Sequence, residues 1–420
     1  MREMKDSGIS WVGEIPKHWE VKPIRAIFIE NNNKNIWGKE TNALQFKSGE
    51  IVSKQNFDAS EDDYVADTIL KYNIVDNGMI VINGLNLNFD FVTKRVGLVR
   101  ERGIITSAYM SFFIKDLNTV LPYYASYLLK SYDHCAAFHN MGGGVRKILN
   151  FAELKHNLFV VPPLSEQKVI SEYLDKECWK IDVLKADIQV QIDTLEQYKR
   201  SVITEAVTKG LNSSAPMKKC SVSWARQIPQ HWKVMPNKHL MTKIKNICPV
   251  YKGEDILSLT MYGIIVRDLD AGGKMPSSFD GYQYIKNGNL LMCLFDIDVT
   301  PRCIGIIKQD GITSPAYSQF KMKKIADAKF YYYYYLMLDY TKELLHFAKN
   351  LRHSLTEEQL GAIKQLVPPI EEQYAIAEYL DERCTKIEKI IADKKAQIET
   401  LEAYKKSVIY EYVTGKKEIV

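Results

Sequence analysis

The sequence has no apolar run long enough to cross a bilayer. The longest run, residues 330–338, has nine residues, five of them tyrosine, whereas a membrane helix needs about 20 apolar residues. The opening stretch MREMKDSGISWVGEIP lacks the apolar centre of a secretory signal. The seven cysteines form no CxxC pair, which favours free thiols in a reducing compartment. These absences predict a cytoplasmic protein.

The motifs of common enzyme classes are also missing. No GxxxxGK[ST], GxSxG or HExxH occurs, and no GxGxxG follows a predicted strand. The GGGVRK run at 142–147 lacks the spacing and the hydroxyl of a phosphate loop. The group Asp133, His134, Cys135 and His139 fits a helix surface with one buried thiol better than a metal site. We therefore expect no catalytic residue, no metal and no cofactor in this chain.

The composition is that of an ordinary globular protein. The 420 residues are 46% hydrophobic and 25% charged, which excludes a disordered chain and a disulfide-stapled mini-protein. This length suggests two or three domains.

The chain contains an internal repeat. Residues 162–208 and 368–414 align without a gap at an offset of 206, sharing Pro-Pro, Glu-Gln, EYLD, QI, TLE, YK and SVI. A second echo pairs SWVGEIPKHW at 10–19 with SWARQIPQHW at 223–232. The regions between these blocks differ. The chain is therefore two half-molecules with shared frames and divergent interiors.

The repeated blocks predict two long helices. Residues 164–208 contain no Pro or Gly, and apolar residues recur every seven positions, as in a helix that supercoils against a partner. The predicted seam comprises Leu174, Ile181, Ile188, Leu195 and Val202, widened by Leu184, Ile192 and Tyr198, and in the second block Leu380, Ile387, Leu401 and Val408, interrupted by Lys394. Packed antiparallel, two such helices would hold the variable regions far apart.

The variable regions read as mixed α and β. Short strands are predicted at 78–82, 95–99, 109–114 and 289–295, between Gly, Asn and Asp turns. Helices are predicted at 122–138 and 326–350, followed by a basic turn and a short helix at 151–158 or 356–363. The tyrosine run fits a helix core and its flank better than a base-stacking platform.

The charge is unevenly distributed along the chain. Residues 17–150 hold 16 basic and 14 acidic residues, and residues 230–360 hold 17 and 13. The helical block 162–210 holds 7 basic and 9 acidic residues, and the block 368–420 holds 9 basic and 11 acidic residues. A polyanion would therefore bind the globular regions, leaving the helices for packing and protein partners.

Local cation clusters give candidate DNA contacts. A glycine loop that carries Arg can bring backbone N–H groups to phosphates and a guanidinium to guanine; a helix-ending turn with solvated cations is the alternative. The Asn-rich INGLNLNF stretch at 82–89 could read adenine edges, although a structural Asn-rich hairpin is the commoner explanation of such a stretch. The candidates are Lys94, Arg95 and Arg302 at strand ends, Gly142, Gly143, Gly144, Arg146 and Lys147 in the first glycine loop, and Lys349, Arg352 and His353 at the equivalent place in the second repeat.

This layout resembles that of the specificity subunits of type I restriction-modification systems. The resemblance covers nearly the whole chain. It rests on a variable region followed by a Pro-Pro-[LI]-x-Glu-Gln helix, twice, and on the IPxHW entries at 15–19 and 228–232.

The resemblance implies an α+β fold with a pseudo-twofold internal repeat. Two mixed α/β target recognition domains, at 1–160 and 213–366, would be separated by two conserved helices, at 161–212 and 367–420, packed as an antiparallel coiled coil.

The resemblance also implies a function. Each recognition domain would read one half of a bipartite, asymmetric site on double-stranded DNA, while the coiled coil sets the spacing and docks two modification (methyltransferase) subunits. Restriction (motor-nuclease) subunits would complete the complex. S-adenosylmethionine, ATP and Mg are expected on those partners, and this chain would be non-catalytic.

Two other functions remain open from the residues. A coiled-coil scaffold whose globular ends bind proteins would suit the acidic helices, although the basic, unlike globular regions favour DNA readout. A stand-alone methyltransferase or nuclease would need motifs that the sequence lacks.

Overall fold

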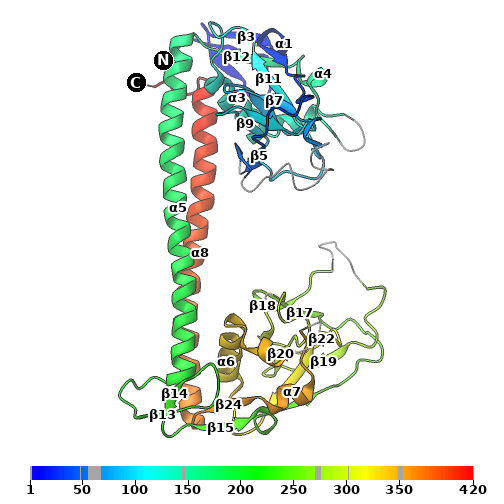
Figure 1. The fold of residues 1–420 in the computed structure, drawn as a ribbon, viewed down its shortest axis with the longest axis vertical. Coiled ribbons are helices and arrows are strands. Elements are labelled where there is room, and N and C mark those ends of the chain that lie inside the picture. Colours follow the sequence, from blue (N-terminus) through cyan, green and yellow to red (C-terminus); the bar gives the residue numbers. More distant parts are fainter. Residues whose placement is uncertain are drawn as a thin grey trace. The chain divides into compact units, whose positions relative to one another are not determined.

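The computed structural model describes residues 2–47, 49–54, 68–143, 147–269, 276–300, 302–348 and 353–419. The chain divides into two compact units (Figure 1): unit 1 is Met1–Ile188 with Ala396–Val420, and unit 2 is Gln189–Lys395. Each unit contains a mixed α/β domain and part of both long helices, which the sequence-based boundaries had placed in segments of their own. The predicted α+β class is confirmed.

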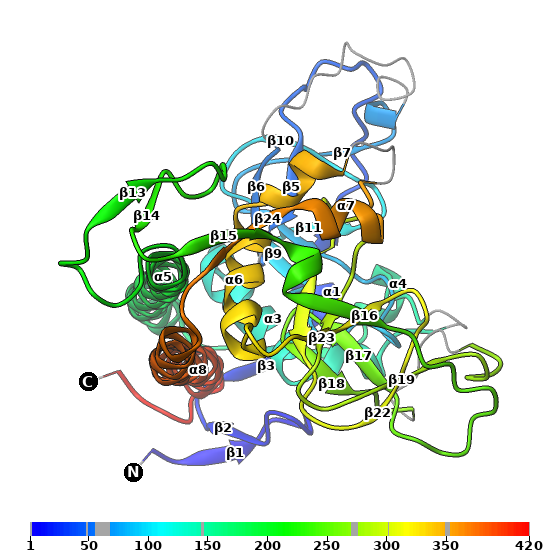
Figure 2. The same ribbon diagram turned by 90° about the horizontal axis from the view of Figure 1, so that it is seen from below.

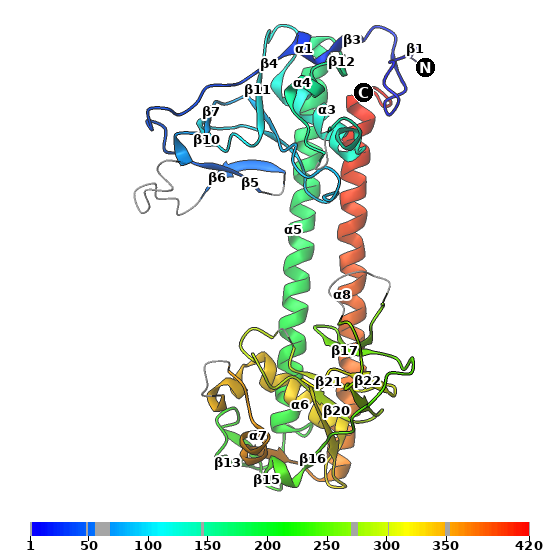
Figure 3. The same ribbon diagram turned by 90° about the vertical axis from the view of Figure 1, so that its right-hand side faces the viewer.

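Unit 1 is built on a four-stranded antiparallel sheet in the order β4-β11-β8-β9. Helix α3 packs between this sheet and the long helices (Figure 3). The elements of the sheet and helices are β4 (Phe28–Glu30), β8 (Ile80–Ile82), β9 (Val96–Leu98), β11 (Met110–Ile114), α1 (Ile24–Ile27), α3 (Pro122–His134), η1 (Ala137–Asn140) and α4 (Phe151–Leu154). Paired strands complete the unit: β1 (Met4–Asp6) with β2 (Glu14–Pro16), β3 (Glu20–Pro23) with β12 (Leu158–Val161), β5 (Leu44–Lys47) with β6 (Glu50–Ser53), and β7 (Asn73–Val75) with β10 (Gly103–Ile105).

Unit 2 repeats this topology, with the sheet order β16-β23-β20-β21. Its sheet and helices are β16 (Met241–Ile244), β20 (Leu290–Met292), β21 (Ile304–Ile306), β23 (Ser318–Met322), α6 (Ala328–Tyr340), η2 (Asn237–His239), η3 (Glu343–Phe347) and α7 (Glu357–Ala362). Its strand pairs are β13 (Met217–Lys219) with β14 (Gln227–Pro229), β15 (Lys233–Pro236) with β24 (Lys364–Val367), β17 (Leu257–Thr260) with β18 (Gly263–Val266), and β19 (Gln283–Ile285) with β22 (Gly311–Thr313). The divergent interiors therefore share one fold.

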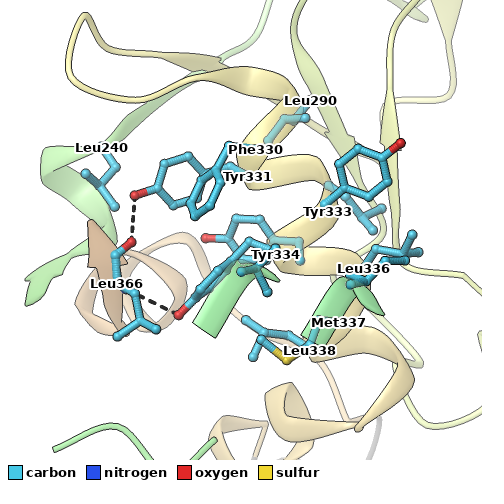
Figure 4. Packing of buried hydrophobic residues seen from close by; sticks show 14 of the residues in the cluster. Leu240, Leu290, Phe330, Tyr331, Tyr333, Tyr334, Leu336, Met337, Leu338 and Leu366 are labelled. Atoms are coloured by element: carbon cyan, nitrogen blue, oxygen red, sulfur yellow. Dashed lines mark hydrogen bonds between the residues drawn. The ribbon is translucent and has the colours of Figure 1, made fainter. Parts of the chain in front are cut away.

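The tyrosine run forms part of the core of unit 2 (Figure 4). Tyr331, Tyr334 and Tyr335 of α6 are buried. The Tyr331 hydroxyl donates to the Leu366 carbonyl at 2.9 Å, and the Tyr334 hydroxyl accepts from the Leu366 N–H at 3.2 Å. These bonds satisfy phenol groups that burial would otherwise leave unpaired. The predicted core role of this run is confirmed.

The Glu-Gln pair at the start of each long helix explains the repeated motifs. Glu166, at the start of α5 (Leu164–Lys209), accepts from the Trp19 indole at 3.0 Å, and its other oxygen lies 2.6 Å from His18 Nε2. Glu372, at the start of α8 (Ile370–Val413), accepts from Trp232 at 3.0 Å and lies 2.7 Å from His231 Nε2. Each carboxylate thus joins an IPxHW segment to the start of a long helix through its contacts with the Trp and His side chains.

The neighbouring glutamine joins the helix to the domain. Gln167, which is fully buried, accepts from the Leu121 N–H at 2.8 Å and donates to the Thr119 and Pro162 carbonyls. Gln373 makes the same three bonds to Asp327, Ile325 and Pro368. A buried amide is stable only with its donors and acceptor paired, which accounts for this residue type at both positions.

Helices α5 and α8 lie side by side in each unit (Figure 2). In unit 1, Lys405 donates to Asp182 at 2.6 Å, and Lys185 pairs with Glu402. From one ion pair to the next, the residue number rises on α5 and falls on α8, as antiparallel packing requires. In unit 2, Lys199 pairs with Glu388, which is the Asp182–Lys405 pair repeated with the helices exchanged.

Most of the predicted seam lies between the helices. Leu174, Ile181, Ile192, Val202, Leu380, Ile387 and Val408 are buried, and Ile188, Leu195, Leu401 and Lys394 are half-buried. The prediction was wrong for Leu184 and Tyr198, which are 51% and 50% exposed. Each precedes a seam position by one residue, a rotation of about 100° around the helix. Those seam positions are occupied by Lys185 and Lys199.

A pair of substitutions tests this helix register. We expect Ile181→Asp to lower the free energy of unfolding by about 3–5 kcal/mol, because it places a charge in the seam. Leu184→Asp, three residues away, is the matched control and should change it by about 0.5 kcal/mol or less. Denaturant unfolding of the full chain, followed by circular dichroism, measures both. Equal destabilisation by the two variants would contradict the register.

Candidate nucleic-acid interface

Each unit carries a pair of loops that bind each other at one edge of the four-stranded sheet. In unit 1, the β8–β9 loop (residues 83–95) meets the segment after α3: the Leu87 N–H donates to the Lys147 carbonyl at 3.1 Å, and the Leu149 N–H donates to the Gly84 carbonyl at 2.9 Å. We call the β8–β9 loop of unit 1 and the β20–β21 loop of unit 2 (residues 293–303) the recognition loops.

Unit 2 repeats this pairing with different side chains. The Ile297 N–H donates to the His353 carbonyl at 3.3 Å, and the Leu355 N–H donates to the Leu294 carbonyl at 2.8 Å. Lys147 and His353 both have positive φ, 35° and 42°. The backbone therefore supports the predicted equivalence of the two segments, although the second lacks the triple glycine.

The glycines of the first segment permit close packing. A Cβ on Gly142 would lie 2.8 Å from Leu87 Cδ1, and one on Gly143 would lie 2.7 Å from Glu153 Oε1. Both distances are shorter than side chains tolerate. Four predicted contacts lie outside the described residues: Gly144, Arg146, Lys349 and Arg352.

The recognition loops share a backbone bend. Asn86 and Asp296 adopt left-handed φ of 55° and 46°, where Asn and Asp are better tolerated than most residues. The Asp90 N–H returns to the Asn86 carbonyl at 3.1 Å, and the Thr300 N–H returns to the Asp296 carbonyl at 2.9 Å. In the unit 1 loop, hydrogen bonds from the side chain and N–H of Thr93 lower the pKa of Asp90 to about 2. This carboxylate is thus charged and fixed in position.

The recognition loops expose large apolar residues, which the sequence-based prediction missed. Phe89 is 78% exposed and Val92 is 92% exposed. Phe91 is also exposed, with its ring stacked on His139 at 4.6 Å. In unit 2, Val299 is 73% exposed. The sequence could have indicated these exposed residues, because bulky apolar side chains in an Asn-rich turn have few neighbours to pack against.

Lys94 and Arg302 occupy equivalent places beneath a hairpin turn. Lys94 lies against Gly49 in the β5–β6 turn, with its ammonium 3.7 Å from Glu402. The Arg302 guanidinium donates to the Met261 carbonyl in the β17–β18 turn at 3.0 Å and contacts the Tyr332 ring. Both cations support the fold, and their contact with DNA stays a prediction.

The surface role predicted for Arg95 is contradicted by the structure. Its side chain is fully buried, and its guanidinium donates to carbonyls of the recognition loop itself. Lys147 is exposed, and His353 is about half exposed with its Nδ1 3.0 Å from Asp298. Of the described candidates, Gly142, Gly143, Lys147 and His353 therefore remain accessible beside the apolar loop tips.

Neither a membrane-spanning helix nor a metal-binding cluster occurs among the described residues. No helix among them is long and apolar enough to span a membrane. No three His, Cys, Asp or Glu side chains within those ranges are grouped so as to hold a metal ion. All seven cysteines are free.

Comparisons with known proteins point to one family. The family model for the type I restriction modification DNA specificity domain matches residues 16–193. Two proteins of Methanocaldococcus jannaschii are each 25% identical to 96% of the chain: the putative type I restriction enzyme MjaX specificity subunit, of which 95% is covered, and the MjaVIII specificity subunit, of which 93% is covered.

A solved structure shares the fold. A chain from work on complex assembly and conformational transition of the type I R-M system superposes with a TM-score of 0.68 at 11% identity, covering 96% of this chain and 99% of that one. The matching domain model, the two relatives and the repeated architecture make this chain similar, over nearly its whole length, to the specificity subunits of type I restriction enzymes.

Proposed function

We propose that the chain reads a bipartite, asymmetric DNA site, one half with each unit, within a type I restriction-modification complex. The observation that carries this proposal is the pair of recognition loops, which share a backbone but differ in exposed side chains. Two equivalent scaffolds with unlike contact surfaces suit two different base sequences. A site read in this way is non-palindromic, because half-site symmetry follows protein symmetry.

The chemistry of the loops suits both kinds of DNA contact. Phe89, Phe91 and Val92 can contact thymine methyl groups or wedge between base steps. The Lys147 ammonium and the backbone N–H of Gly142 can hold phosphates and fix the register. Apolar tips supply base discrimination, and the adjoining segment supplies affinity.

The long helices are the proposed spacer. Helix α5 is continuous over 46 residues and α8 over 44. Because a continuous helix has a fixed length, the number of unread base pairs between the half-sites would also be fixed.

Exposed apolar residues on the coiled coil are the proposed docking sites for two modification subunits. The proposed residues are one pair among the exposed apolar residues of each unit, Leu184 with Tyr404 in unit 1 and Ile390 with Tyr198 in unit 2. They are related by the 206-residue repeat offset. Asp182, the acidic partner of Lys405, comes directly after the seam residue Ile181. Leu184 comes directly before the next seam position, Lys185. Asp182 and Leu184 therefore lie on opposite sides of the seam. Two equivalent apolar pairs suit two copies of one partner.

The remaining activities would belong to partner subunits. In this proposal, the chain itself is non-catalytic and binds no cofactor. Methyl transfer with S-adenosylmethionine would belong to the modification subunits, and ATP- and Mg-dependent cleavage to motor-nuclease subunits.

DNA binding by the full chain is testable with random-sequence duplexes. If the two units together neutralise about four phosphates, affinity should fall roughly 100-fold between about 50 and 200 mM salt. Lys147→Gln should weaken binding and flatten the salt dependence, since it removes one phosphate contact. Lys176→Gln, an exposed change of equal charge on α5, is the control. Fluorescence anisotropy titrations provide the readout; salt-independent binding, or none, would instead favour a protein scaffold.

Partner docking is testable through stoichiometry. Leu184→Asp should reduce two bound modification subunits to one, because it places a charge in the apolar pair of unit 1. Leu184→Asp with Ile390→Asp should release both. Val190→Asp, an equally polar change at an exposed position, should retain two. Native mass spectrometry of the co-expressed complex counts them; two partners on the double variant would rule out these docking sites.

A further inference from the structure

A buried cation holds the recognition loop of unit 1 from the inside. Arg95 Nη1 donates to the carbonyls of Asn83 at 3.1 Å and Leu85 at 2.7 Å, and Nη2 donates to the carbonyl of Asp90 at 2.5 Å. The side chain is fully buried. One guanidinium therefore ties together both ends of the turn that carries Phe89.

A different cation holds the loop of unit 2. Lys342 Nζ donates to the carbonyls of Ile297 and Thr300, each at 3.2 Å. It also lies 3.1 Å from the buried carboxylate of Asp339, which fixes the ammonium beneath the loop. Lys342 follows helix α6, whereas Arg95 immediately precedes β9.

The two cations occupy positions that are not equivalent in the repeat. The backbone N–H of Arg95 donates to Asp133 Oδ2 at 2.7 Å, and that of Cys303 donates to Asp339 Oδ2 at 2.8 Å, so Cys303 stands where unit 1 has Arg95. Lys342 has a φ of 54°, and the equivalent Ala136 has a φ of 53°. Each unit thus has a cation at one of the two positions and a small residue at the other.

The target of the cation is conserved although its source is not. Asp90 and Thr300 are equivalent, because their N–H groups close the same bend on Asn86 and Asp296. The carbonyls of Asp90 and Thr300 are bound by Arg95 and Lys342 respectively. Retaining this contact through two different side chains indicates that the loop conformation itself is required.

We propose that Arg95 and Lys342 are positioning residues that preorganise the two recognition loops for base readout. Neither touches DNA: Arg95 is buried, and the Lys342 ammonium is occupied by loop carbonyls. Without its cation, a loop would have to become ordered on binding, at a cost in affinity and base discrimination. This inference rests on the proposed function, because it assumes that the loops contact the half-sites.

The test selects DNA with the full chain. A duplex library with a randomised core is enriched on wild-type protein, and sequencing gives the base preference at each position of both half-sites. Arg95→Met should lower affinity for the wild-type site roughly tenfold and flatten the preferences of one half-site only. Lys342→Met should do the same to the other half-site.

A rescue experiment separates positioning from general stability. Adding Ala136→Lys to Arg95→Met installs the unit 2 arrangement in unit 1, and the lost preferences should return. Cys303→Arg should rescue Lys342→Met in the same way. Ala136→Lys alone should leave both half-sites unchanged, and thermal unfolding of every variant checks that the chain is folded.

Three results would overturn the inference: preserved preferences in both Met variants, loss in both half-sites from a single variant, or failure of both rescues in folded protein. If Arg95→Met does not fold, the result for Lys342→Met alone tests the inference. The Lys342 side chain is partly exposed, so its replacement should destabilise the fold less. Failure of the proposed function looks different, since the wild-type chain would then enrich no sequence at all.

Discussion

Each unit depends on one buried tryptophan that joins the start of one long helix to the end of the other. The Trp19 indole donates to Glu166 at the start of α5, and its ring lies against Gly415 just after α8, where a Cβ would be 3.0 Å away. Trp232 links Glu372 of α8 to Gly210 after α5 in the same way. Both glycines have positive φ, so glycine serves the turn as well as the contact. Each recognition domain is thereby completed by a helix end from the other repeat.

In this arrangement, the residues that hold the frame are the same in both repeats, whereas the residues of the domain interiors differ. The tryptophan, the Glu-Gln pair and the coiled coil recur in both repeats, because they hold the frame. The interiors share strand order and loop backbone while their sequences diverge. Even the cation beneath each recognition loop can move, from Arg95 to Lys342, provided that the same carbonyl is bound. A frame of this kind can accept new base contacts without rebuilding the fold.

The sequence predicted features that depend on local periodicity or exact repetition. The long helices and most of the seam followed from a strict seven-residue spacing, whereas their antiparallel packing was implied by the family resemblance. That spacing could not show which flank of the seam is open, so Leu184 and Tyr198 were misplaced. Arg95 was misassigned because Lys94-Arg95 reads as one basic cluster, and only the folded loop brings three carbonyls to the guanidinium. The apolar loop tips escaped notice because composition favours cations as DNA contacts.

The central claim is that each unit reads its own half of the site. The chain enters the first domain at β3 and leaves it at β12, whose ends Glu20 and Val161 are paired. Residues 20–161 can therefore be exchanged for the corresponding region of another specificity subunit without cutting the frame. Sequencing the methylated sites of cells that carry this chimera with its modification subunits is the most direct test. The account predicts that one half-site changes, while the other half-site and the spacing stay the same. A change in both halves, or in neither, would contradict it.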